Sequence, residues 1–176
     1  ARARSARAPR GPAAATVVPD PAHQRIGLWL PRPLAVGVAR AHLRYRGAVV
    51  DDTPMGLFRQ RDGGRAYLYS QMQGLYARRV VPCFDEPSAK VPWQVTVRAP
   101  AGLGVYANTP EIARRAVGAE VEVAFAPTPP MPSYLLAIAV GGFEVVEVGP
   151  VGGAQVPARI VVPAGQAAAA AAAAAA

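Results

Sequence analysis

EVEVAF, residues 120–125, places Val or Phe at every second position and therefore predicts a strand with one buried face. The same period of two recurs at residues 26–30, 41–46 and 93–98. Successive side chains of a strand point to opposite faces, so each stretch can cover one side of a core while its other side meets water. The alternation favours a fold built from half-buried strands.

Two further stretches extend this pattern. Residues 134–140 are apolar at both parities, which predicts a central strand covered on both faces and broken by the Gly-Gly pair that follows. Residues 66–73 also alternate. The 19 prolines and 17 glycines fall mainly between the strands and leave room for only a turn or two of helix, at residues 110–117. The predicted class is all-β, as a sandwich or an open pair of twisted sheets.

The 176 residues predict one structured domain. Residues 1–19 hold four arginines and no acid, which indicates a basic flexible edge or linker, or alternatively a transit peptide. Residues 20–166 form the expected β domain. Residues 167–176 are an alanine run of uncertain status, either a genuine helix or side chains that were never assigned.

Composition argues against several functional classes. The net charge of +8 falls to +4 after residue 19, and the arginines are dispersed, so we expect no nucleic-acid partner. No apolar run approaches the roughly 18 residues that cross a bilayer, so no membrane span is expected. A single cysteine excludes an intrachain disulfide and favours a reduced, cytoplasmic location. With only two histidines, no metal site is expected in this chain.

The pair Gln71 and Gln73 is a candidate binding site. If residues 66–73 form a strand, Tyr67, Tyr69 and both glutamines share one face. Two amides beyond two tyrosines can line a polar cleft and hold an amine or a carbonyl. An ordinary solvated strand face explains the same spacing.

A Pro-bounded loop contains Cys83, Asp85 and Glu86. Cys83 has no histidine near it in sequence, which favours a small buried side chain over a reactive thiol. The adjacent carboxylates diverge and do not make a glycosidase pair. We expect an ion pair between one of them and Arg78 or Arg79.

The order of residues 70–93 resembles the N-terminal domain signature of zinc aminopeptidases of the aminopeptidase N type, in the gluzincin family. That signature reads Thr-Gln-x-Glu, then Ala-Arg-Arg, Pro-Cys-x-Asp-Glu-Pro and a Lys before an aromatic residue. The residues that match after the glutamines are Arg78, Arg79, Cys83, Asp85, Glu86, Pro87 and Lys90. Residues 43–47, 55–59, 108–110 and 128–137 are similar to further segments of the family in the same order.

The resemblance implies a saddle-shaped, largely antiparallel β domain over about residues 22–165. It also implies that Gln73 and its neighbour Gln71 contact the substrate's free N-terminus, because the family's Glu at the position of Gln73 helps to bind the α-amino group. An amide there keeps a hydrogen-bond acceptor and loses the charge. The leukotriene-hydrolysing relatives also carry Gln at this point.

The family's zinc ligands and general base come from an H-E-x-x-H helix in a thermolysin-like catalytic domain, and this sequence holds no such motif. The expectation is therefore the N-terminal substrate-cleft domain of a zinc metalloaminopeptidase, which would bind no zinc and be inactive by itself. The zinc and the catalytic domain would belong to the complete enzyme. The alternative is a non-catalytic protein-interaction scaffold derived from the same family.

Overall fold

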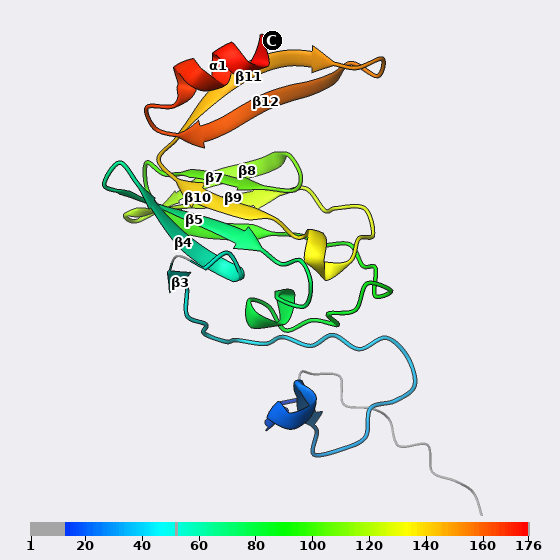
Figure 1. Ribbon diagram of the computed structural model, residues 1–176. Helices are drawn as coiled ribbons and strands as arrows, with labels where there is room; N and C mark the ends of the chain where they lie inside the picture. The colour runs from blue at the N-terminus through cyan, green and yellow to red at the C-terminus, as the bar shows by residue number, and fades with distance from the viewer. Residues whose placement is uncertain (1–12, 52, 176) are drawn as a thin grey trace, which may run out of the picture. The chain divides into compact units, whose positions relative to one another are not determined.

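The structure is a computed structural model that describes residues 13–51 and 53–175, and the chain divides into two compact units, Ala1–Arg44 and Tyr45–Ala176 (Figure 1). Most of the predicted basic edge, with its four arginines, lies outside the described residues.

The first unit contains a β-hairpin. Strand β1 (Thr16–Asp20) pairs antiparallel with β2 (Arg25–Trp29) around the short 3-10 helix η1 (Pro21–His23). The Asp20 carboxylate caps η1 by accepting the His23 N–H, at 3.3 Å. The strand predicted at residues 26–30 is confirmed, and β1 includes residues 16–19.

The strand predicted at residues 41–46 is wrong, because residues 38–49 have no regular secondary structure. Alternation decides which face of a strand would be buried. It does not supply a neighbouring strand whose N–H and C=O groups can complete the hydrogen bonds, and the described residues offer none to this segment.

The second unit holds three sheets. A five-stranded sheet has the order β3 (Val50–Asp51), β4 (Gly56–Asp62), β5 (Arg65–Gln71), β10 (Ile138–Gly141) and β7 (Gly104–Ala107), and only the β3–β4 pairing is parallel. A three-stranded antiparallel sheet has the order β6 (Thr96–Pro100), β9 (Glu120–Phe125) and β8 (Glu111–Val117). The hairpin of β11 (Phe143–Val151) and β12 (Val156–Pro163) contacts helix α1 (Ala167–Ala174).

The predicted all-β class is confirmed, with sandwich-like packing. Five buried residues from both larger sheets share one hydrophobic cluster: Ala99, Val105, Val123, Phe125 and Val140. Val123 is fully buried, in the middle of the stretch whose alternation predicted a strand. Burial of an aliphatic or aromatic side chain of this kind stabilises the fold by roughly 1.5–3 kcal/mol.

The prediction of a turn or two of helix at residues 110–117 is wrong, because these residues form β8. The chain reverses at Gly118, which has φ +60°, and β8 then pairs with β9 from Val117↔Glu120 to Glu111↔Phe125. Seven residues are too few for a stable helix in isolation, so the cross-strand hydrogen bonds decide their conformation.

The apolar run at residues 134–140 is only partly a strand. It begins in the 3-10 helix η3 (Ser133–Leu135), and β10 starts at Ile138. As predicted, β10 is an inner strand, between β5 and β7. Strand β10 ends at the predicted Gly-Gly pair, and its last residue has to be glycine because a Cβ at Gly141 would lie 2.5 Å from the Tyr67 ring.

Phe143, just past that break, joins the β11–β12 hairpin to the five-stranded sheet. Its ring centroid lies 5.1 Å from Tyr67, 5.8 Å from Tyr69 and 5.6 Å from Tyr106. The Tyr67 hydroxyl also accepts the Ala164 N–H at 3.0 Å and donates to the Gly142 carbonyl at 3.4 Å. Aromatic packing and two hydrogen bonds therefore hold the hairpin at this point.

Candidate functional site

The two candidate glutamines lie where β5 ends and the chain turns. Strand β5 stops at Gln71, two residues earlier than predicted, and Gln73 begins the turn. The Gln71 side-chain oxygen accepts the Gln73 backbone N–H at 2.9 Å, and Gly74 follows with φ +65°. Both glutamines are exposed. They are therefore linked through a turn, and strand alternation does not place them side by side.

Buried residues anchor this turn at both ends. Met72 is 1% exposed and Ala77 is fully buried, and both pack with Leu136. The Tyr76 N–H donates to the Met72 carbonyl at 3.2 Å, which closes the turn before the 3-10 helix η2 (Ala77–Arg79). Gln73 is thus an exposed polar residue on a turn whose ends are fixed in a hydrophobic cluster.

A buried carboxylate fixes the helix that follows. Asp85 Oδ2 accepts from the Arg78 backbone N at 3.1 Å and from Arg78 Nε at 2.9 Å, and the Asp85 carbonyl accepts from Arg78 Nη2 at 3.1 Å. The Asp85 side chain is 3% exposed and that of Arg78 is 26% exposed. The predicted ion pair across the loop is confirmed, between Arg78 and Asp85.

Ser133 completes this network. Its hydroxyl, itself buried, donates to Asp85 Oδ1 at 2.6 Å. Burial alone would raise the pKa of Asp85, but the hydrogen bonds from Ser133 and Arg78 outweigh it and hold the pKa below its ordinary value. Asp85 therefore stays ionised at neutral pH, and both of its carboxylate oxygens have donors.

Sequence reasoning missed Ser133. The residue lies directly before the apolar run at residues 134–140, and no role was predicted for it. A signal was present, because a lone hydroxyl between Pro132 and an apolar stretch has to find a partner when it is buried.

Cys83 behaves as the sequence analysis favoured. It is partly buried and packs against the cluster of Met72, Ala77 and Leu136. Burial and the negative charge of Asp85 raise the pKa of its thiol, which outweighs the opposite effects of Arg78 and Ser133. A protonated thiol is a poor nucleophile.

The other signature residues lie on the surface. The Arg79 guanidinium lies over the Tyr76 ring, 5.0 Å from its centroid. Glu86, Pro87 and Lys90 are exposed, in turns where the Glu86 carbonyl accepts the Ala89 N–H at 2.9 Å.

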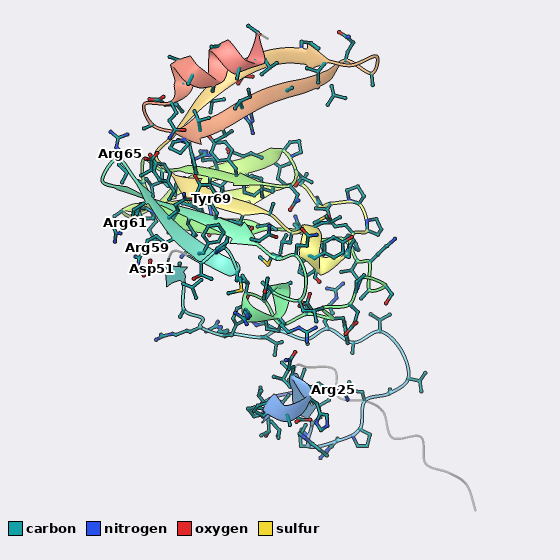
Figure 2. The ribbon with its side chains drawn as sticks, in the orientation of Figure 1. Arg25, Asp51, Arg59, Arg61, Arg65 and Tyr69 are labelled. Carbon is teal, nitrogen blue, oxygen red and sulfur yellow. The ribbon has the colours of Figure 1, made fainter. Side chains whose placement is uncertain are left out.

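The two glutamines do not line the pocket beside the tyrosines of β5. A pocket of about 340 Å³ is lined by Tyr67 and Tyr69 together with Gln60, Arg61, Asp62 and Gln166, and neither Gln71 nor Gln73 is part of it. Figure 2 shows Tyr69 on β5 and the arginines of the β4–β5 hairpin, where Arg59 pairs with Asp51 at 2.6 Å.

The described residues do not fit a zinc site. Nowhere in residues 13–51 and 53–175 do three His, Cys, Asp or Glu side chains gather closely enough to hold a metal ion. His23 pairs with Asp20 at 2.9 Å, and His42 is exposed. No helix in the described part of the chain is both long and apolar enough to cross a membrane.

Comparisons with known proteins match a region of the chain that includes the signature at residues 70–93. The profile of the Peptidase M1 N-terminal domain family matches residues 5–135. The chain is 33% identical over 103 residues to probable aminopeptidase 1 of Saccharolobus solfataricus and 37% identical over 111 residues to aminopeptidase Q of Felis catus. It is also 33% identical over 119 residues to aminopeptidase M1 of Arabidopsis thaliana. The matches cover 58%, 58% and 65% of this chain and 13%, 11% and 13% of these relatives.

Proposed function

The chain belongs to the Peptidase M1 N-terminal domain family, and from this membership we propose that it forms the N-terminal substrate-cleft domain of a zinc metalloaminopeptidase. The complete enzyme would remove N-terminal residues from peptides. The zinc would be held by a thermolysin-like catalytic domain, since the described residues offer no ligand cluster. A cytoplasmic location is part of the same proposal and rests on the single cysteine.

The anchored turn is the observation that carries this role. A group that holds a substrate's amine has to be exposed and yet fixed in position, because a small displacement weakens an oriented contact. Gln73 meets both conditions, as an exposed residue on a turn fixed by Met72, Ala77 and the Arg78–Asp85 ion pair. In this proposal the Gln73 side-chain oxygen accepts a hydrogen bond from the substrate's ammonium group.

Gln71 supports the turn. Its side-chain oxygen is occupied by the Gln73 N–H, and its amide NH₂ group keeps the capacity to donate to a substrate carbonyl. Gln73 would therefore meet the amine and Gln71 the first carbonyl group.

The test uses the complete protein that contains this chain. Gln73→Glu should raise kcat/KM for aminoacyl-anilides with a free amine several-fold, on the order of 1 kcal/mol, because a carboxylate adds charge to the hydrogen bond. Substrates with an acetylated amine should show no gain. If Gln73→Glu and Gln73→Ala both leave kcat/KM for free-amine substrates unchanged, Gln73 does not contact the substrate.

The same assay separates the scaffold alternative, which the neutral Gln73 favours. A non-catalytic protein would show no turnover of aminoacyl-anilides in any variant, even with added zinc. For the present chain alone we expect no stoichiometric zinc on metal analysis and no turnover. Zinc binding or turnover by this chain would contradict the proposal that a separate domain holds the zinc and catalyses the reaction.

A further inference from the structure

A groove lies beside the start of β6 and the three residues that precede it. It encloses about 490 Å³, within the range of ligand-binding sites. Five consecutive residues, 93–97, line one side of it. Consecutive side chains of an extended chain point to opposite faces, so a groove that touches all five follows the edge of the strand and its backbone.

The pairing with β9 decides which backbone groups of this edge point away from the sheet. The Phe125 N–H donates to the Val95 carbonyl at 3.0 Å, which makes Val95 and Phe125 a hydrogen-bonded antiparallel pair. The neighbouring pair, Thr96 and Ala124, is then a non-hydrogen-bonded pair. Thr96 therefore turns its N–H and C=O away from β9, toward the free edge.

Strand β6 ends its sheet among the described residues, in the order β6-β9-β8. The same alternation continues to Gln94, because the Trp93 carbonyl points toward the segment that follows β9, where it accepts the Thr128 N–H at 2.8 Å. Gln94 and Thr96 thus present two sets of outward backbone donors and acceptors. Unpaired strand edges of this kind are templates for another strand.

The remaining walls are apolar, with one cation. Leu57, Val80, Val81, Leu136 and Ile138 line the groove, and so do Tyr45, Gly47 and Ala48 of the segment before β3. Among these described lining residues, Arg79 alone carries a charge. Apolar walls favour a ligand with aliphatic side chains, and an exposed guanidinium favours a carboxylate.

We propose that this groove is a docking site for an extended peptide, which adds a strand to the edge of β6 and places an acidic group against Arg79. The peptide's main chain pairs with the N–H and C=O of Gln94 and Thr96, and its aliphatic side chains pack on Val80 and Ile138. Recognition by strand addition takes affinity from main-chain hydrogen bonds and specificity from alternate side chains. The inference stands on the groove alone and holds whether or not the proposed peptidase role is correct.

Trp93 provides the readout, because it lines the groove and the chain has only one other tryptophan, Trp29. In the Trp29→Phe variant of the whole chain, fluorescence reports on Trp93 alone. The probe is the hexapeptide acetyl-Glu-Leu-Ser-Val-Thr-Val-amide, with a second version that carries the Glu at its carboxyl end. One of the two should give a saturable change in Trp93 fluorescence, and replacing its Glu by Lys should weaken binding about tenfold.

Three variants test the mode of binding. Thr96→Pro removes the outward N–H and should abolish saturable binding, while proline at an edge position leaves the β6–β9 pairing intact. Thr96→Val keeps the N–H and should bind normally. Arg79→Gln should remove the preference for Glu over Lys. A peptide that carries N-methyl groups on the alternate amides that would face β6 provides the same test without altering the protein, and it should not bind.

Each contrary outcome overturns the proposal. Peptide binding that survives both Thr96→Pro and N-methylation is not strand addition, and the absence of saturable binding by either probe removes the site. The Thr96 amide could exchange hydrogen slowly in the free chain and lose this protection when residues 1–49 are deleted. That result would show that the chain's own N-terminal part pairs with the edge. A concentration-dependent dimer that Thr96→Pro disrupts would assign the edge to a second copy.

Discussion

Two carboxylates in different parts of the molecule each hold two partners. Asp85 meets Arg78 and Ser133 in the loop after η2, where its side chain is 3% exposed. Glu122 meets Arg98 at 2.7 Å and Arg115 at 2.6 Å on the outer face of β6-β9-β8, where the arginines are 49% and 67% exposed. The contacts have similar lengths, so the difference in their energetic value comes from access to water.

The largest expected effect tests the buried network. Asp85→Ala leaves the Arg78 guanidinium and the Ser133 hydroxyl without their acceptor, and it should lower the free energy of unfolding by about 3–5 kcal/mol. Urea unfolding followed by circular dichroism measures the loss. An equal loss in Asp85→Asn and Asp85→Ala would show that the charge matters and the remaining hydrogen bonds do not.

Ser133→Ala should cost less. It removes one donor and keeps the ion pair, but one oxygen of a buried carboxylate then has no partner, which costs about 1–3 kcal/mol. The same urea unfolding experiment measures it. If Ser133→Ala is neutral in the wild-type background, water has replaced the hydroxyl and the site is wetter than its burial indicates.

Much of this comparison is visible in the sequence. The Arg78–Asp85 pair could be expected because the two residues are only seven positions apart, in one loop that contains Pro82. Ser133 lies 48 residues from Asp85, and no local pattern encodes that contact. Similarly, alternation predicts β2 and β9 correctly, but it cannot show that residues 41–46 have no neighbour to pair with.

The candidate site, too, was predicted from the sequence only in part. Sequence order identified Gln73 as a residue to test. It did not show that β5 ends at Gln71, because a strand's end depends on where its partner ends, and Gln71 is opposite Gly56, the first residue of β4. A Cβ on Gly56 would lie 3.3 Å from Val80, so this close packing against the next segment is a tertiary constraint.

Acid should weaken the buried network by a smaller amount than truncation does. The pKa of Asp85 is below its ordinary value of 3.8, so its stabilisation is complete above about pH 3.8 and is lost as the pH falls through the folded-state pKa. The difference in unfolding free energy between wild type and Asp85→Asn should therefore shrink between pH 5 and pH 2. Asp51, Glu111 and Glu122 also have lowered pKa values, but they titrate in both proteins and cancel.

The smallest effect is expected on the outer sheet face. Glu122→Ala removes both arginine contacts at once, yet it should leave the urea midpoint unchanged within error, because exposed ion pairs contribute little and salt screens them. A clear loss of stability that disappears in about 1 M NaCl would show that Arg98, Glu122 and Arg115 act as a network. The exposed group and the buried Asp85 network would then differ less in their contributions to stability.

The order of strands in the five-stranded sheet also determines when each strand can find its partner during synthesis. Strands β4 and β5 form a local hairpin, but the next partner of β5 is β10, some 70 residues later, and the Tyr67 hydroxyl bonds across 97 residues to Ala164. Contacts of such long sequence separation form slowly, because the intervening chain has to be closed into a loop first. During translation, the edge of β5 that pairs with β10 stays unpaired until residue 141 has left the ribosome. During that interval the nascent chain exposes a strand edge rich in aromatic residues, so synthesis rate and chaperone access should govern its yield of folded protein.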